Sequence, residues 1–391
     1  MRNEAWIPPL LEDLRRSSLQ RALSPLPAVG GRITIEGREF LNFASNDYLD
    51  FARRPELAEA VRSAVARFGS GATASRLMAG SLPCHIDLEA RLAKFKGYPA
   101  ALVFGSGYLA NAGILPALVG RDDVIFADKL AHASLIDGAL LSRAKLVRFR
   151  HNDAAHLDRQ LAAAPPAARK LVVTESVFSM DGDRAPLSDL CEVAQRHGAM
   201  IFVDEAHSTG VFGPSGGGLV REHGLEGAVN VSMGTLSKSL GSYGGFAAFS
   251  TPMRDWLVNK ARTFIFDTAL PPPAVAAAIA SIDLLEQNPG LGAELLRRAR
   301  HFRASLRSAG LAVNESDSQI VPLIVGPSAG ALRLSQRLRA RGILAPAVRP
   351  PTVPEGTARL RFSVTLAHRE EDLSLAAAAV GAAMAEEGLQ Q

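Results

Sequence analysis

The apolar residues between positions 100 and 235 alternate between two patterns. Short runs rich in Val, Ile, Leu and Phe are separated by segments in which apolar residues recur at helical spacing, such as 132–142 and 187–198. Continuous apolar strands that alternate with helices form parallel sheets covered on both faces, so we expect an α/β fold with a large, mostly parallel sheet. The expected strands are ALVF (101–104), DVIFAD (123–128), KLVRF (145–149), KLVVTESVF (170–178), AMIFVDEAH (199–207) and VNVSMG (229–234).

The flanking segments predict further elements. An arm at the N-terminus should hold an amphipathic helix and short strands, and the second half of the chain should end in a smaller α/β domain. The prolines at 271–273 should precede a long helix. The expected elements are helices near 9–22, 55–68, 84–96 and 329–341 and strands within 31–43, 320–325 and 358–365, in domains spanning 1–45, 46–287 and 288–391.

Composition narrows the class of protein. The 391 residues are 47% hydrophobic and 21% charged, and 43 basic against 39 acidic residues leave a net charge of +4. This surplus is too small and too dispersed to indicate a nucleic-acid partner. Two cysteines, Cys84 and Cys191, provide neither a disulfide framework nor a zinc cluster. No signal peptide and no apolar run of roughly 18 residues is present, so we expect a cytoplasmic protein without a membrane partner.

Three expected strands are followed by residues that carry chemistry. After ALVF, the segment GSGYLAN opens a helix whose free N–H groups suit a phosphate. After AMIFV come Asp204 and His207, and after VNVSM comes Lys238 in GTLSKSLGSYGG, whose glycines and serines are expected to leave room for a planar ring. Strand ends of an α/β sheet meet at one edge. A phosphate cradle, an acid and a lysine together fit pyridoxal phosphate, which acts as an electron sink.

Other interpretations remain open for each feature alone. GSGYLA followed by Asp128 also fits a dinucleotide-binding fingerprint, which would indicate a nicotinamide oxidoreductase. Asp204–His207 spells the DEAH of helicases, but no phosphate loop precedes it. A regulator with an aminotransferase-like sensor domain would need a DNA-binding domain, for which residues 1–45 are too short and too weakly basic.

Taken together, the motifs resemble the α-oxoamine synthases of the fold-type I pyridoxal-phosphate enzymes, which have the aspartate aminotransferase-like fold. The resemblance covers most of the chain. It rests on SNDYLDF (45–51), GSGATASRLMAGS (69–81), DKLAHASLIDG (128–138), ESVFSMDGDRAPL (175–187), VDEAHSTGVFG (203–213) and GTLSKSLG (234–241). One departure is GPSGGGLV (213–220), where the family often has an arginine between the last glycines.

The resemblance implies the roles of the catalytic residues. Lys238 would bind the cofactor covalently and act as the base at the substrate α-carbon. Asp204 would pair with the pyridine nitrogen, and His132 would stack on the ring. His207 and Ser179 would make polar contacts to the cofactor.

It also implies the phosphate and substrate contacts. Thr235 and the backbone of Gly107 and Tyr108 would hold the phosphate. Asn46 and Arg349 would bind polar groups of the substrate, Arg349 through a bidentate contact to a carboxylate.

The segment VRPPTVPEGTARLRFSVTLAH (348–368) is similar to the branch that joins L-alanine to a pimeloyl thioester, on coenzyme A or an acyl carrier protein, in biotin synthesis. In that branch Thr352 would contact substrate and Arg21 would face the acyl group. A homodimer with a shared active site is implied. The alternatives within the family are a glycine C-acetyltransferase and a 5-aminolevulinate synthase, which use glycine.

Overall fold

The computed structural model describes residues 3–389, which divide into two compact units. Residues 46–179 and 183–295 form the first, called here the sheet unit. The second, called the terminal unit, comprises described residues within 1–45, 180–182 and 296–391. The division into domains at 1–45, 46–287 and 288–391 that the sequence suggests stays a prediction.

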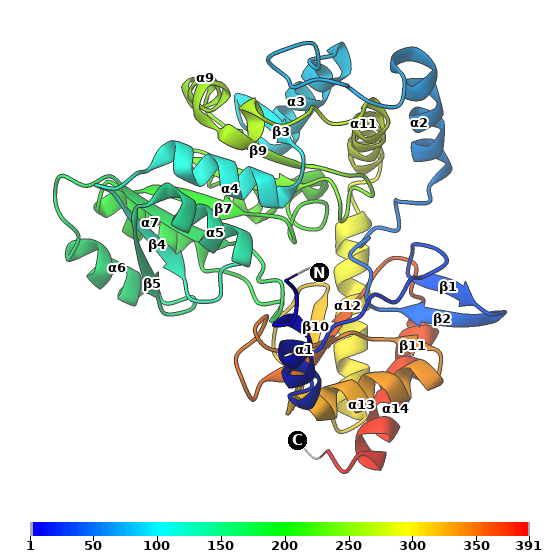
Figure 1. Cartoon of the computed structure of the whole chain (residues 1–391). Coiled ribbons are helices and arrows are strands. Elements are labelled where there is room, and N and C mark those ends of the chain that lie inside the picture. The colour runs from blue at the N-terminus through cyan, green and yellow to red at the C-terminus, as the bar shows by residue number, and fades with distance from the viewer. Residues whose placement is uncertain (1–2, 390–391) are drawn as a thin grey trace. The chain divides into compact units, whose positions relative to one another are not determined.

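The sheet unit is built on seven strands in the order β3-β9-β8-β7-β6-β4-β5 (Figure 1). Strands β4 to β8 pair in parallel, which confirms the mostly parallel α/β sheet. The strands are β3 (Ala100–Phe104), β4 (Val124–Asp128), β5 (Lys145–Phe149), β6 (Lys170–Glu175), β7 (Met200–Asp204), β8 (Val231–Thr235) and β9 (Gly245–Phe249).

The sequence did not predict β9, which pairs antiparallel with both β3 and β8. Three of the five residues in its sequence GFAAF are small, so it lacks the continuous branched run that marked the other strands. The strand nevertheless is fully buried, because it lies between two neighbours. β9 thus joins the edge strand β3 to β8, and β6, β7 and β8 are each paired on both sides.

Helices cover the two faces of this sheet. One core cluster joins alternate strand residues, such as Ile125, Val173 and Met233, to α4, α5, α9 and α10. The intervening residues, such as Val172 and Ile201, are also buried, as expected for a sheet covered on both sides. The helices of the unit are α2 (Pro55–Phe68), α3 (Pro83–Lys96), α4 (Gly107–Leu118), α5 (Ala133–Ser142), α6 (Ala154–Ala162), α7 (Leu187–Arg196), the 3-10 turn η1 (Pro214–Gly216), α8 (Leu219–Glu222), α9 (Thr251–Lys260), α10 (Arg262–Ile265) and α11 (Pro272–Gln287).

The terminal unit contains two small sheets, ordered β1-β2-β11 and β10-β13-β12. Its core includes Phe43, whose ring stacks on Phe302 at 5.3 Å and on His368 at 4.3 Å between centroids. Burial lowers the pKa of His368 to about 4, so this imidazole packs in its neutral form. The elements are α1 (Ile7–Arg16), β1 (Arg32–Ile35), β2 (Arg38–Asn42), β10 (Ile320–Gly326), α13 (Ser328–Ala340), β11 (Ile343–Leu344), β12 (Ala347–Val348), β13 (Ala358–Ser363), α14 (Glu370–Glu386) and α12 (Leu291–Ser308), which begins in the sheet unit.

The expected arm helix over 9–22 is wrong in its bounds, because α1 ends at Arg16. The Ser17 hydroxyl donates back to the Asp13 carbonyl at 2.7 Å, and Ser18 adopts a left-handed backbone with φ 58°. A left-handed residue stops a right-handed helix. Two proline residues in the first turn move the start forward to Ile7.

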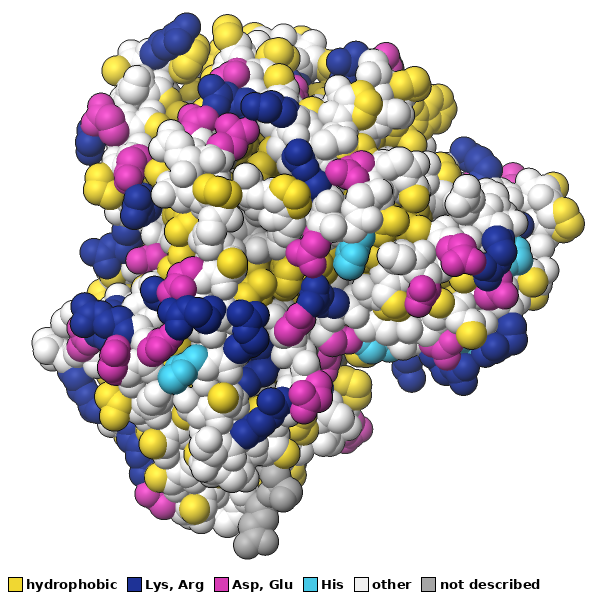
Figure 2. Space-filling view, turned by 180° about the vertical axis from the view of Figure 1, so that it is seen from behind, with side chains coloured by type: hydrophobic (Ala, Val, Ile, Leu, Met, Phe, Trp, Pro, Cys, Tyr) yellow, Lys and Arg dark blue, Asp and Glu magenta, His cyan; other side chains and the backbone are white. Residues whose placement is uncertain are grey.

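None of the described helices is long and apolar enough to cross a bilayer. On the face drawn in Figure 2, basic and acidic side chains are interspersed.

Candidate active site

The ends of β3, β6, β7 and β8 meet at a cavity of about 220 Å³ within the sheet unit. This is the edge where ligands bind in sheets of this kind. The structure brings together seven of the predicted site residues here. The predicted residues that line the cavity are Gly107, Tyr108, His132, Asp204, His207, Thr235 and Lys238. The other lining residues are Ser106, Asn111, Ser134, Glu175, Ala206, Met233 and Ser237.

Lys238 follows β8 and is half-buried. Its Nζ lies 2.8 Å from Nε2 of His207, and Nδ1 of the same ring lies 2.7 Å from the hydroxyl of Tyr48. Tyr48 is fully buried, so this phenol is held by the protein and not by solvent. The lysine amine is thus the end of a hydrogen-bonded chain that runs through His207.

The glycines around Lys238 do not leave the open space that we expected. A Cβ at Gly234 would lie 2.4 Å from the Phe246 ring, and one at Gly245 would lie 2.4 Å from the backbone of Ser106. These glycines are needed for close packing, and Gly245 in particular lets β9 approach the turn before α4. The space beside Lys238 is created by this packing.

Asp204 ends β7 and is buried, with a donor on each carboxylate oxygen. The backbone N–H of Ala206 donates to Oδ1 and the side-chain nitrogen of Asn111 donates to Oδ2, both at 2.9 Å. Hydrogen bonds donated to a carboxylate favour its charged form. Asp204 is therefore held as a fixed acceptor at the wall of the cavity.

His132 caps the N-terminus of α5 and retains exposed surface in the cavity. Its Nδ1 lies 2.8 Å from the Ser134 hydroxyl, and its backbone N–H donates to Oε1 of Glu175 at 2.7 Å. Burial by the surrounding protein lowers the pKa of His132, the charge of Lys238 adds to this, and Asp204 opposes it. The ring is accordingly favoured as the neutral imidazole.

The N-terminus of α4 forms a polar cradle with the end of β8. The Ser106 side chain caps the helix by accepting from the Leu109 N–H at 3.1 Å, while the first-turn N–H groups of a helix lack intrahelical acceptors. A Cβ at Gly107 would lie 3.5 Å from Cβ of Thr235. Backbone N–H groups and hydroxyls so arranged suit a phosphate.

Comparison with known proteins agrees with this geometry. The aminotransferase class I and II family matches residues 38–380. The 8-amino-7-oxononanoate synthase of Anaeromyxobacter dehalogenans strain 2CP-1 is 50% identical over 93% of this chain and 91% of its own. That of Geobacter metallireducens is 47% identical over 95% of this chain and 96% of its own. The chain belongs to the 8-amino-7-oxononanoate synthase family.

Solved structures of the wider family share the fold. A serine palmitoyltransferase variant from S. paucimobilis, which holds a PLP–myriocin aldimine, has a TM-score of 0.94 and 33% identity, with 100% of both chains covered. The 8-amino-7-oxononanoate synthase of Francisella tularensis has a TM-score of 0.76 and 28% identity over 89% of this chain and 99% of its own. These findings confirm the fold-type I expectation and do not favour the glycine-using alternatives.

The cavity residues also fit the family's cofactor, pyridoxal phosphate. The site combines an amine at Lys238, a fixed carboxylate at Asp204 and a cradle around Gly107 that a side chain would fill. The nicotinamide alternative does not fit as well. Its expected acid, Asp128, is buried and accepts hydrogen bonds from the backbone of Leu130 and Asn152 and from His151, so its oxygens are occupied.

Two predicted residues of the sheet unit do not line this cavity, as far as the described residues define it. Asn46 accepts a hydrogen bond from the Tyr48 hydroxyl at 3.2 Å, and the same hydroxyl contacts His207. Ser179 is buried in the loop after β6. Their contacts with a cofactor or substrate stay predictions.

The three remaining predicted residues meet inside the terminal unit. Arg349 donates to the carbonyl of Ser18, and Arg21 donates to the carbonyl of Pro350 at 3.4 Å. The backbone N–H of Thr352 donates to the Arg349 carbonyl at 3.1 Å. Burial lowers the pKa of Arg349, and the neighbouring charge of Arg21 lowers it further. Two guanidinium groups this close favour an anion beside them.

A buried ion pair supports the turn that carries Asp204 and His207. Lys96 Nζ lies 2.6 Å from Oε2 of Glu205, and both side chains are almost completely buried. Oε1 of Glu205 accepts from the Val220 N–H at 3.0 Å. Glu205, the second residue of the DEAH sequence, therefore anchors this turn instead of facing the cavity.

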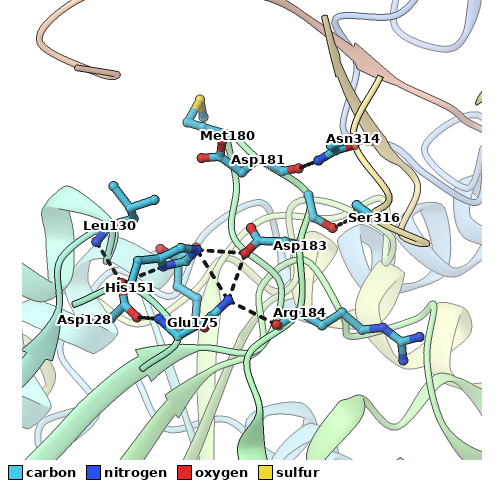
Figure 3. Close-up of polar contacts among 12 residues, drawn as sticks. Asp128, Leu130, His151, Glu175, Met180, Asp181, Asp183, Arg184, Asn314 and Ser316 are labelled. Carbon is cyan, nitrogen blue, oxygen red and sulfur yellow. Dashed lines mark hydrogen bonds and ion pairs between the residues drawn. The ribbon is translucent and has the colours of Figure 1, made fainter. Parts of the chain in front are cut away.

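His151 bridges the end of β4 and the loop after β6 (Figure 3). Nδ1 lies 2.9 Å from Oδ1 of Asp128, the last residue of β4, and Nε2 lies 2.7 Å from Oδ2 of Asp183, after the loop that contains Ser179. Although burial opposes the charge, the two carboxylates raise the pKa of His151 to about 10. It is held as an imidazolium between two anions.

Sequence reasoning missed Glu175, Asn111 and Tyr48. Glu175 ends β6, so the strand-end rule that found Asp204 could have found it. Burial and the nearby Asp204 raise the pKa of Glu175 well above its usual range, which favours the neutral acid. Asn111 and Tyr48 lie in the quoted segments GSGYLAN and SNDYLDF, but those segments indicate no role for either residue, because their contacts are with residues far away in the sequence.

Proposed function

We propose that this chain catalyses the decarboxylative condensation of L-alanine with a pimeloyl thioester, giving 8-amino-7-oxononanoate in biotin synthesis. A carbon–carbon bond forms between Cα of alanine and the thioester carbonyl, and the carbon–sulfur bond breaks to release the thiol of coenzyme A or of an acyl carrier protein. The alanine carboxylate leaves as carbon dioxide, and a proton takes its place. The relatives at 47–50% identity carry the assignment, since the serine palmitoyltransferases are only 33–34% identical.

The cavity residues would each hold one part of the cofactor. When bound, pyridoxal phosphate supplies an electron-withdrawing ring that stabilises negative charge on the substrate α-carbon. Lys238 would attach it, Asp204 would pair with the pyridine nitrogen and His132 would cover the ring. His207 and Ser179 would contact the polar groups of the ring. Gly107, Tyr108 and Thr235 would hold the phosphate.

Lys238 also moves the protons of the reaction. Its Nζ would accept the α-proton of alanine as a neutral amine and later return a proton to the same carbon. The contact of 2.8 Å with His207 supports this role, because the ring nitrogen can exchange a proton with the amine. Asp204, with both oxygens already oriented by donors, needs no rearrangement as charge develops.

The polar residues of the terminal unit would bind the substrates. Arg349 presents a planar donor group that suits a bidentate contact with the alanine carboxylate. Arg21 would face the acyl substrate, Thr352 would contact substrate, and Asn46 of the sheet unit would bind a polar substrate group. Arg21 and Arg349 each donate to a backbone carbonyl close to the other in sequence, and the charge of Arg21 lowers the pKa of Arg349, which supports an anionic ligand.

One assay tests the proposal. The protein, loaded with pyridoxal phosphate, is given L-alanine with pimeloyl-coenzyme A or pimeloyl-carrier protein, and the product is identified by mass. We expect 8-amino-7-oxononanoate and a visible cofactor absorbance band, both abolished in Lys238→Ala. A preference for glycine with a short acyl thioester would overturn the substrate assignment, and a wild-type protein without the absorbance band would overturn the cofactor.

A further inference from the structure

Asn111 lies in the second turn of α4, is completely buried and has two acceptors for one nitrogen. Its Nδ2 lies 2.9 Å from Oδ2 of Asp204 and 2.9 Å from the Ser134 hydroxyl oxygen. Asn111 thus contacts Asp204, which would pair with the cofactor nitrogen, and Ser134, which supports His132.

The chemistry of its neighbours fixes the orientation of the Asn111 amide. An ionised carboxylate only accepts hydrogen bonds, so the amide nitrogen must face Asp204. The second hydrogen on that nitrogen is then available to Ser134. Oδ1 of Asn111 is buried without a partner among the described residues, which is unfavourable. This orientation of the amide nevertheless directs both of its hydrogens at acceptors, on Asp204 and Ser134.

The same logic continues to His132. Because the Ser134 oxygen accepts from Asn111, its own hydrogen is directed at Nδ1 of His132, 2.8 Å away. The backbone N–H of Ser134 also points at this nitrogen, at 3.2 Å. Nδ1 is therefore an acceptor, and a neutral imidazole with that arrangement carries its proton on Nε2. The lowered pKa of His132 agrees with a neutral ring.

We propose that Asn111 is a positioning residue that aligns the Asp204 carboxylate and, through Ser134, fixes His132 as its neutral Nε2–H tautomer. The Asn111 amide nitrogen thus links Asp204, which would pair with the cofactor nitrogen, to His132, which would cover the ring. The proposal rests on the proposed function for what Asp204 and His132 serve, but the hydrogen-bonded chain is a property of the protein itself.

The tautomer is measured first, in protein free of cofactor. Histidine labelled with ¹⁵N distinguishes a protonated from an unprotonated ring nitrogen, and the His132 signals are assigned by their loss in His132→Gln. In the wild type we expect a protonated Nε2 and an unprotonated Nδ1. In Asn111→Leu, which has a similar volume and no donor, the Nδ1–H form should become populated. Ser134→Ala leaves the Asn111–Asp204 contact intact and removes the hydroxyl donor but keeps the backbone N–H of residue 134, so we expect a smaller rise of the Nδ1–H form.

Asn42→Leu is the matched control, because Asn42 is also buried and also donates its amide, to the Gly30 carbonyl at 2.9 Å. It should lower stability without changing the His132 signals. A wild-type His132 in the Nδ1–H form, or signals unchanged in both Asn111→Leu and Ser134→Ala, would overturn the proposal. If Asn111→Leu does not fold, Ser134→Ala decides the tautomer alone.

Cofactor affinity provides the second measurement. Losing a hydrogen bond to a charged group should weaken pyridoxal-phosphate binding about tenfold or more in Asn111→Leu. Ser134→Ala should weaken it less, since Asp204 keeps its donor. Equal affinities in wild type and Asn111→Leu would contradict the Asp204 part of the proposal. A wild-type protein that fails to bind the cofactor would contradict the proposed function, whereas the tautomer measurement would still stand.

Discussion

At the scale of single residues, two carboxyl groups lie side by side in the site and have different hydrogen-bonding environments. Glu175 and Asp204 pair in register at the ends of β6 and β7. Asp204 has two donors, whereas burial and the charge of Asp204 raise the pKa of Glu175. Neighbouring acids in different environments can take different roles. Here Asp204 is an oriented hydrogen-bond acceptor, and Glu175 holds the His132 backbone as a neutral acid.

Replacing Glu175 tests this assignment. Because its folded pKa is raised, wild-type stability should fall as pH rises above the ordinary value of about 4.3, towards the folded pKa. Glu175→Gln is neutral throughout, so its advantage over the wild type should grow with pH, by at most about 1.4 kcal/mol per pH unit. Denaturant unfolding from pH 4 to 8 measures the difference.

Glu175→Ala is the comparison variant, since it leaves the buried N–H of His132 without its acceptor. It should lose about 1–3 kcal/mol relative to Glu175→Gln. A stability difference between wild type and Glu175→Gln that stays constant with pH would show that Glu175 is ionised in the folded protein.

At the scale of elements, loops are held in place by contacts that connect them across the sheet edge. His151 follows β5 and bridges Asp128 and Asp183, so it fixes both the segment that leads to His132 and the end of the loop that contains Ser179. Since the folded pKa is raised to about 10, its stabilisation is complete below about pH 6.5. It is lost as pH rises through about 10.

His151→Leu leaves the buried Asp128 without its cation, so we expect a loss of about 3–5 kcal/mol at pH 6. The loss should shrink towards pH 10, where the wild-type imidazolium also gives up its proton. Thermal or denaturant unfolding across this range measures both effects. His223→Gln, at an exposed histidine after α8, should show no comparable dependence on pH. A His151→Leu loss that does not change with pH would contradict a charged His151.

The elements also show which parts of the fold are readable from sequence. Helix α2 begins and ends where its pattern indicates, and the strands rich in Val, Ile and Phe are found where expected. The site residues Asp204 and Lys238 follow from strand ends, because the parallel topology brings those ends together. β9 could not be predicted, because its burial comes from partners more than a hundred residues apart in sequence, in β3 and β8. The roles of Asn111 and Tyr48 could not be predicted for the same reason, because they come from side-chain contacts with residues distant in sequence.

At the scale of the whole molecule, the sheet unit exposes large apolar side chains that a soluble monomer usually buries or disperses. Met78 is 80% exposed, Phe266 71% and Tyr243 58%, and all three lie in loops or at element ends. Where exposed apolar residues of this size gather into one patch, they mark an interface with another protein. We propose that a second copy of the chain covers them, in line with the homodimer that the family resemblance implies.

The double variant Met78→Ser with Phe266→Ser tests the dimer. Removing two large apolar side chains from an interface should weaken self-association by roughly a hundredfold or more, because burying each contributes about 1.5–3 kcal/mol. Sedimentation over a range of concentrations measures the dissociation constant. Leu375→Ser, at a 69% exposed leucine on α14, is the matched control and should leave association unchanged. A double variant that dimerises as tightly as the wild type would place the interface elsewhere, and a wild type that sediments as a monomer would contradict the homodimer. If the active site is also shared between copies, activity per chain should fall with the fraction of dimer.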